Sequence, residues 1–262
     1  MKGMTRHIPN LLTCISLTCG FYAAILGLSG YFFSAMCALI LAAIFDFSDG
    51  LAARLLKAGS VLGKELDSLS DIVSFGVAPG MMVFRFLASL LHSLSWNESI
   101  VSQSILLTVV AIPVFSAIRL AKFNIDDRQK TTFIGLPVPA HAIFWSSLIV
   151  VLSSDVHASF CLLPQAAMLL ASFNPEIIIF ALSLLSIVTS LLLISRIPMF
   201  SLKLSSLSWK ANQMHYILLV SALLLFIIFG ILGITLSILL YFFLSLSGFS
   251  GKDHRSKPIR DT

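Results

Sequence analysis

Long apolar runs follow one another along the whole chain, and they constrain its fold more than any other feature. Of the 262 residues, 58% are hydrophobic and only 11% are charged, with a mean hydropathy of +0.99. A helix of about 20 apolar residues crosses the hydrocarbon core of a bilayer, and its backbone groups are satisfied within the helix. The sequence therefore predicts an all-α fold, a polytopic membrane helical bundle.

The apolar runs indicate about eight membrane spans in total. The segment 156–173 is also apolar, but it is short and broken by Pro164, which favours an interfacial or re-entrant segment over a further span. The predicted spans cover residues 10–28, 31–54, 65–90, 100–122, 139–155, 174–195, 214–229 and 231–247.

The basic residues predict how these spans are oriented. If the amino end lies inside, all of the 17 Lys and Arg residues except Arg85 fall in the inner segments. An excess of Lys and Arg marks loops that stay in the cytoplasm. The pattern predicts a multi-pass protein of the cell (inner) membrane, whose net charge of +5 suits anionic lipids and phosphates and does not indicate a nucleic-acid partner.

Four aspartates lie inside or against the second and third predicted spans, at Asp46, Asp49, Asp67 and Asp71. Intramembrane acids are unfavourable and tend to mark functional sites. The spacings i, i+3 and i, i+4 place each pair on one helix face. If the two helices face each other, four carboxylates meet that cannot all stay ionised without cations. Oxygen ligands alone favour Mg²⁺, Mn²⁺ or Ca²⁺, and two such ions are a known device for phosphoryl transfer.

The aspartates belong to a longer pattern, D-x2-D-G-x2-A-R-x8-G-x3-D-x3-D, which runs from Asp46 to Asp71. The pattern resembles the signature of the CDP-alcohol phosphatidyltransferases, and every fixed position is filled. Its other fixed residues are Gly50, Ala53, Arg54 and Gly63.

The resemblance implies a role for each position of the motif. The four aspartates would hold two divalent ions, Mg²⁺ or Mn²⁺, and Asp71 would also be the general base. Gly50, Ala53, Arg54 and Gly63 would bind the CDP-linked lipid. The resemblance also implies a core of six spans and direct in-line attack by the acceptor alcohol, with no covalent enzyme intermediate.

Two further stretches are similar to one branch of this family, the bacterial phosphatidylserine synthases. These are DSLSDIVSFGVAP at 67–79 and IRLAKFN at 118–124, the second followed by GLPVPAHA. This resemblance implies that CDP-diacylglycerol and L-serine form phosphatidylserine and CMP. It makes Arg119, Lys122 and Asn124 the candidates for serine binding. A cytoplasmic anchor would by itself explain the two cations, but it would not explain Asn124.

The resemblance also suggests how the chain is divided. We expect a phosphatidyltransferase membrane domain at 1–205, an additional transmembrane hairpin at 206–248 and a basic cytoplasmic tail at 249–262. The active site is expected at the cytoplasmic face, among membrane lipids. The sequence leaves the oligomeric state open, a homodimer included.

Two other interpretations stay open at this point. The aspartate motif recognises only the CDP end, so the acceptor could be glycerol 3-phosphate, inositol phosphate or choline. From another class, the chain could be a cation transporter that uses the aspartates as a relay. Gly50, Gly63 and Arg54 would have no role in that transporter.

Overall fold

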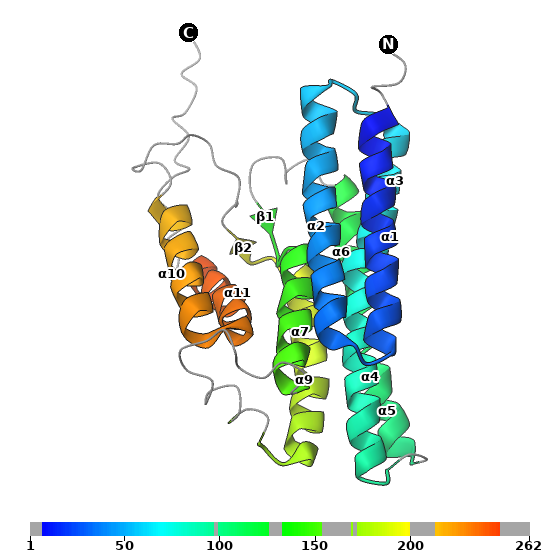
Figure 1. The fold of residues 1–262 in the computed structure, drawn as a ribbon, viewed down its shortest axis with the longest axis vertical. Coiled ribbons are helices and arrows are strands. Elements are labelled where there is room, and N and C mark those ends of the chain that lie inside the picture. The colour runs from blue at the N-terminus through cyan, green and yellow to red at the C-terminus, as the bar shows by residue number, and fades with distance from the viewer. Residues whose placement is uncertain are drawn as a thin grey trace.

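The computed structural model describes residues 7–96, 99–125, 133–153, 169, 172–199 and 213–246. Within these ranges the helices run up and down beside one another and form an elongated bundle (Figure 1). Two strands of two residues each, β1 (Phe133–Ile134) and β2 (Pro198–Met199), pair antiparallel. The all-α, polytopic prediction is therefore confirmed, with this strand pair as a small addition.

The helices follow the predicted spans closely. A π-helix, η2 (Ile72–Val77), joins α3 and α4 into one continuous helix. The α-helices are α1 (Ile8–Leu28), α2 (Phe32–Leu55), α3 (Val61–Asp71), α4 (Ala78–Ser93), α5 (Ile100–Thr108), α6 (Ala111–Ile125), α7 (Val138–Leu152), α9 (Pro175–Ile194), α10 (Gln213–Phe229) and α11 (Ile231–Leu246).

Among the described residues, five helices are long and apolar enough to cross a membrane. These are α1, α2, the helix Val61–Ser93, the helix Ile100–Ile125 and α9, whereas α7, α10 and α11 are shorter apolar helices. The third span begins earlier than predicted because Ser60 caps it, its hydroxyl accepting a hydrogen bond from the amide of Gly63. Most of the segment 156–173 lies outside the described residues.

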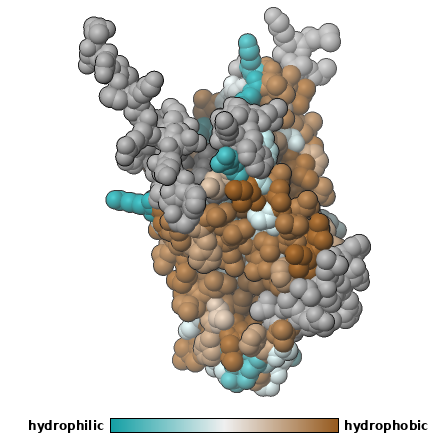
Figure 2. All heavy atoms as spheres, turned by 90° about the vertical axis from the view of Figure 1, so that its left-hand side faces the viewer, coloured by the Kyte–Doolittle hydropathy of each residue, from teal (hydrophilic) through white to brown (hydrophobic). Residues whose placement is uncertain are grey.

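The outer surface is apolar over most of its height. Figure 2 shows a broad hydrophobic belt, with hydrophilic residues gathered toward its two ends. Large side chains such as Phe21, Leu184 and Leu219 are at least 60% exposed. A surface of this kind suits contact with lipid chains, which agrees with a membrane-embedded bundle.

The charged residues are unevenly placed along the bundle. The start of α1, the α2–α3 turn and the end of α6 lie toward the same end of the molecule (Figure 1). Lys57 lies in the turn, Arg54 and Lys64 lie in the helices on either side of it, and Lys122 lies near the end of α6. Arg85 lies toward the other end, beside Gly30 of the α1–α2 turn. Among the described residues, these four basic side chains and Arg85 thus lie toward opposite ends of the bundle, and the side of the membrane that each end faces stays a prediction.

Helix α1 packs between α2 and the continuous α3–η2–α4 helix through a stripe of small buried residues. The hydroxyl of Ser16 donates to the carbonyl of Ala42 on α2, at 2.9 Å, and Ser74 of η2 donates to the carbonyl of Ser16, at 3.3 Å. Small residues let membrane helices approach closely and hydrogen-bond. A Cβ atom at Gly20 would lie only 2.5 Å from the Cα atom of Ser74. The stripe therefore fixes the distance between the helices that carry the aspartates.

Replacing Gly20 with alanine should loosen this packing. The added methyl group would collide with the backbone of Ser74, so we expect a loss of about 1–3 kcal/mol of stability. Thermal unfolding in detergent micelles should show a lower melting temperature for Gly20→Ala. The control is Thr18→Ala, on the exposed face of the same helix. Equal melting temperatures for the two variants would contradict the close packing of α1.

Candidate functional site

The four aspartates of the sequence motif meet at one end of the bundle. Atoms of the Asp46, Asp49 and Asp67 carboxyl groups all lie within 4.8 Å of one another. The carboxyl group of Asp46 is also within hydrogen-bonding contact of Asp67 and of Asp71. The last turns of α2 and the face of α3 therefore form one acidic cluster, as the spacing predicts.

The third wall of this cluster is α1, which the sequence-based interpretation did not include. The hydroxyl of Thr13 donates a hydrogen bond of 2.5 Å to Oδ2 of Asp49. The backbone carbonyl of Thr13 accepts a hydrogen bond of 3.4 Å from Ser70 of α3. Thr13 is only 3% exposed and Asp49 only 6%. Helix α1 thus connects the two acidic helices and orients one carboxylate. In the sequence, the stripe of small and hydroxyl residues along α1 was the signal that this helix packs closely against the acidic helices.

The donor set fits a divalent cation. It consists of carboxylate oxygens, the ligands that hard cations such as Mg²⁺ and Mn²⁺ prefer. Oδ1 of Asp71 is buried and makes no hydrogen bond with any residue that the structure describes. Carboxylates this close repel one another unless a proton or a cation lies between them. The cluster could therefore bind a metal ion.

The small residues of the motif have two different surroundings. A Cβ atom on Gly50 would meet nothing within 4 Å, so α2 is open at this point. Arg54 lies one turn further, exposed, with Nε 3.0 Å from the carbonyl oxygen of Gly50. A Cβ atom on Gly63 would instead lie 2.9 Å from the side-chain oxygen of Asn10. The packing of α1 against α3 therefore gives a reason for glycine at position 63.

The π-helix η2 begins directly after Asp71. Single π-helical turns are frequent at functional sites because they change the register of a helix locally. A Cβ atom on Gly76 would lie 3.4 Å from the Cα atom of Pro113, so η2 and α6 are in close contact. The glycine residues of this span, Gly76 and Gly80, therefore lie in and just after the π-helix, where the span packs tightly against α6.

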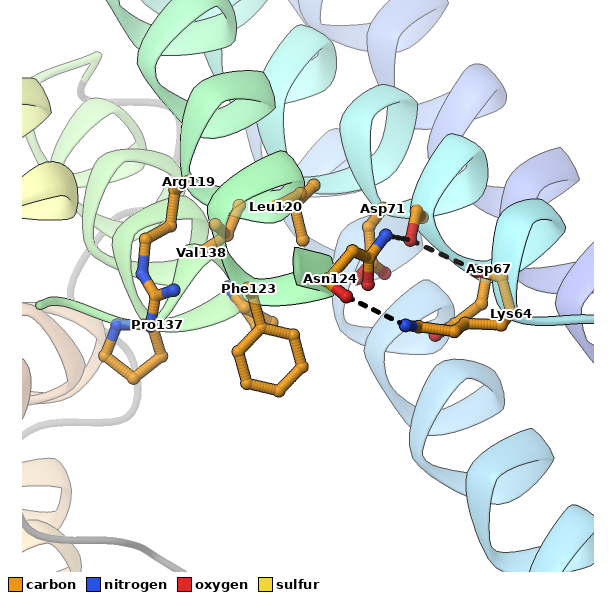
Figure 3. A pocket seen from close by; sticks show the side chains of 11 residues that line it. Lys64, Asp67, Asp71, Arg119, Leu120, Phe123, Asn124, Pro137 and Val138 are labelled. Carbon is orange, nitrogen blue, oxygen red and sulfur yellow. Dashed lines mark hydrogen bonds between the residues drawn. The ribbon is translucent and has the colours of Figure 1, made fainter. Parts of the chain in front are cut away.

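A cavity of about 220 Å³ opens beside the aspartates, between α3, α6 and the start of α7 (Figure 3). Of the residues predicted to bind serine, Arg119 and Asn124 line this cavity. Lys122 is exposed and is not among the residues that line this cavity. The lining residues are Lys64, Asp67, Ser68, Asp71, Arg119, Leu120, Phe123, Asn124, Pro137, Val138 and Pro139.

Hydrogen bonds across the cavity tie α3 to α6. The side-chain amide of Asn124 donates to the hydroxyl of Ser68, at 2.7 Å. The ammonium of Lys64 donates to the backbone carbonyl of Asn124, at 3.1 Å (Figure 3). The guanidinium of Arg119 lies over the ring of Phe123, 5.7 Å from its centroid. The sequence-based interpretation missed Lys64 and Ser68, although Lys64 is only one helical turn from Asp67.

The contact between Thr13 and Asp49 leads to a prediction about metal affinity. Thr13→Val keeps the shape of the side chain but removes the hydroxyl group, so Mn²⁺ binding should weaken about 10-fold or more. Thr13→Ser should restore it. Calorimetric titration with Mn²⁺ measures both, and Thr18→Val is the control because that exposed hydroxyl bonds only within α1. Unchanged Mn²⁺ affinity in Thr13→Val would show that this hydroxyl does not support the site.

Comparison with known proteins identifies the family. The model of the CDP-alcohol phosphatidyltransferase family matches residues 6–175. The CDP-diacylglycerol–serine O-phosphatidyltransferase of Bacillus subtilis (strain 168) is 35% identical over 134 residues, 51% of this chain and 70% of that protein. Its namesake in Helicobacter pylori (strain J99) is 37% identical over 142 residues, 52% of this chain and 54% of that protein. The archaetidylserine synthase of Methanothermobacter thermautotrophicus is 29% identical over 180 residues, 66% of this chain and 72% of that protein. The chain belongs to the CDP-alcohol phosphatidyltransferase family.

Proposed function

We propose that this chain transfers the phosphatidyl group of CDP-diacylglycerol to the hydroxyl group of L-serine. The products would be phosphatidylserine and CMP. The observation that carries the proposal is the complete aspartate motif, gathered beside a cavity that holds Arg119 and Asn124. The Bacillus and Helicobacter relatives are named for this reaction. Glycerol 3-phosphate, inositol phosphate and choline are the acceptors to be tested against serine.

The aspartates would hold the cofactor. We infer two divalent ions, Mg²⁺ or Mn²⁺, bound by Asp46, Asp49, Asp67 and Asp71. When bound, such ions neutralise a diphosphate and stabilise the charge that develops on a leaving phosphate oxygen. Thr13 keeps the Asp49 carboxylate in its orientation from the side of α1.

The open end of α2 is the proposed binding surface for CDP-diacylglycerol. The free space beside Gly50 would let the nucleotide approach the helix backbone. Ala53 is small and partly exposed, and Arg54 is exposed at the end of the helix, where its guanidinium would bind phosphate. We propose that Gly63 also contributes to nucleotide binding, as the motif implies, in addition to packing against Asn10.

Asp71 would be the general base. A serine hydroxyl group is a poor nucleophile at neutral pH, and a carboxylate that accepts its proton makes it reactive. The serine oxygen would then form a bond to the phosphorus atom of the phosphatidyl group as the bond to the CMP oxygen breaks. The unused, buried Oδ1 of Asp71 supports this assignment. Serine is proposed to contact Arg119 and Asn124, which line the cavity. Lys122 is also a proposed contact, although it lies outside the cavity lining.

The position of the site suits a reaction between a soluble and a lipid substrate. The aspartates lie in the last turns of α2 and along α3, near one end of the bundle (Figure 1). We propose that this end faces the cytoplasm and that the protein resides in the cell inner membrane. The hairpin of α10 and α11 lies beyond the matched residues 6–175 and would be an addition to a core at 1–205. The homodimer and the role of the tail at 249–262 stay predictions.

The direct test is an acceptor assay. Purified protein receives CDP-diacylglycerol, Mn²⁺ and either L-serine, glycerol 3-phosphate, inositol phosphate or choline, and both CMP release and lipid product are measured. We expect phosphatidylserine from serine and no turnover in excess chelator, because the aspartates and the diphosphate would repel each other without metal. Lipid product from another acceptor and none from serine would overturn the assignment of serine.

Two substitutions separate chemistry from binding. Asp71→Asn removes the base but keeps the size of the side chain, so the rate of CMP release should fall about 10²-fold or more. Binding of CDP-diacylglycerol, measured by calorimetry, should survive but weaken, because Asp71 is also assigned to the metal ions. Asp46→Asn should lose Mn²⁺ and nucleotide binding together, because Asp46 is assigned to metal ligation alone. Near-normal turnover of Asp71→Asn would refute the general-base role.

A further inference from the structure

Lys64 has no assigned function, yet it lines the same cavity as Asp67 and Asp71. It lies in the first turns of α3, three residues before Asp67 and seven before Asp71, so the three side chains share one side of the helix. The Lys64 side chain is exposed, and its ammonium is directed across the mouth of the cavity toward Asn124 (Figure 3). A positive charge is thus held beside the candidate base.

The chemistry of an amino-acid acceptor requires a cation at this place. If the chain has the proposed function, on which this inference rests, the acceptor hydroxyl must reach Asp71. In serine, the carboxylate is on the carbon next to the hydroxymethyl group. That carboxylate would therefore sit close to Asp67, Asp71 and the diphosphate, all of which are acidic. At separations of about 4 Å, like charges near a protein surface repel one another, and the proposed metal ions are already shared between the aspartates and the diphosphate. A nearby ammonium group offsets this repulsion.

The three basic side chains of this region differ in where they point. The guanidinium of Arg119 is buried, lies over the ring of Phe123 and extends toward Pro137, on the α7 side of the cavity (Figure 3). Lys122 is exposed and outside the lining. Lys64 extends from the helix of the aspartates, and an ammonium group has three donors, of which the bond to Asn124 uses one.

We propose that Lys64 binds the carboxylate of the acceptor amino acid and so favours serine over alcohols that lack a carboxylate. The carbonyl of Asn124 positions the ammonium group for this contact. It belongs to the last turn of α6, whose carbonyls have no partner within the helix and carry partial negative charge. Arg119 would face the same substrate from the opposite side of the cavity.

A purely structural role for Lys64 makes a different prediction. If Lys64 only caps α6, its loss would impair turnover of every acceptor to the same degree. If it binds the carboxylate, its loss would impair serine and spare an acceptor without the negative charge. L-serinamide is such an acceptor, because it keeps the hydroxyl and amino groups of serine and replaces the carboxylate with a neutral amide.

The experiment measures kcat and KM for L-serine and L-serinamide in the full-length protein with CDP-diacylglycerol and Mn²⁺. For Lys64→Gln we expect the KM for serine to rise about 10-fold or more, the loss of one charge-assisted hydrogen bond. The KM for CDP-diacylglycerol should stay within about threefold, and the ratio of kcat/KM between serine and serinamide should fall about 10-fold. Lys64→Arg should keep most of the preference for serine. The matched control is Lys57→Gln, an exposed lysine in the α2–α3 turn outside the cavity lining.

The outcomes separate this proposal from the proposed function. If the unaltered protein makes no phosphatidylserine, the assignment of serine fails, whatever Lys64 does. If it uses serine but Lys64→Gln keeps the normal ratio of serine to serinamide, only the role of Lys64 is wrong. A shift of that ratio in Lys122→Gln and not in Lys64→Gln would assign the carboxylate contact to Lys122.

Discussion

The mutual repulsion of four carboxyl groups is the constraint on which the rest of this structure depends. Asp46, Asp49 and Asp67 lie within 4.8 Å of one another, and Asp71 contacts Asp46. Such a group is unfavourable in a membrane protein unless cations occupy it or neighbouring groups orient it. The fold therefore has to supply rigid helices around the cluster. Helix α1 does this, because it packs closely on both acidic helices and donates a hydrogen bond to Asp49.

The cavity extends this acidic site toward α6 and α7. Its walls combine the aspartates of α3 with Arg119 and Asn124 of α6, and the hydrogen bonds of Asn124 hold the two helices together. Carboxylates that could bind a metal ion and cations that could bind anionic groups thus occupy neighbouring parts of one surface. This division agrees with an enzyme that binds a diphosphate and a charged acceptor side by side.

The sequence predicts the helices and the acidic motif well, because both depend on local patterns. Apolar runs locate the spans, and the spacing of Asp67 and Asp71 places them on one face of α3. Local spacing does not say which other helix comes next to that face, so the contact from Thr13 was not predicted. Nor does a cluster of basic residues reveal which members point inward. Lys122 is predicted to contact serine but is exposed and outside the cavity lining, whereas Lys64 lines the cavity.

We propose above all that the four aspartates form a metal site that receives the diphosphate of CDP-diacylglycerol. The most direct measurement is an experimental structure of the protein with Mn²⁺ and CDP-diacylglycerol, using anomalous scattering to locate manganese. We predict anomalous peaks between Asp46, Asp49, Asp67 and Asp71, with the diphosphate bound at the same place. Bound nucleotide with no manganese at these carboxylates, or manganese at another site, would contradict the claim.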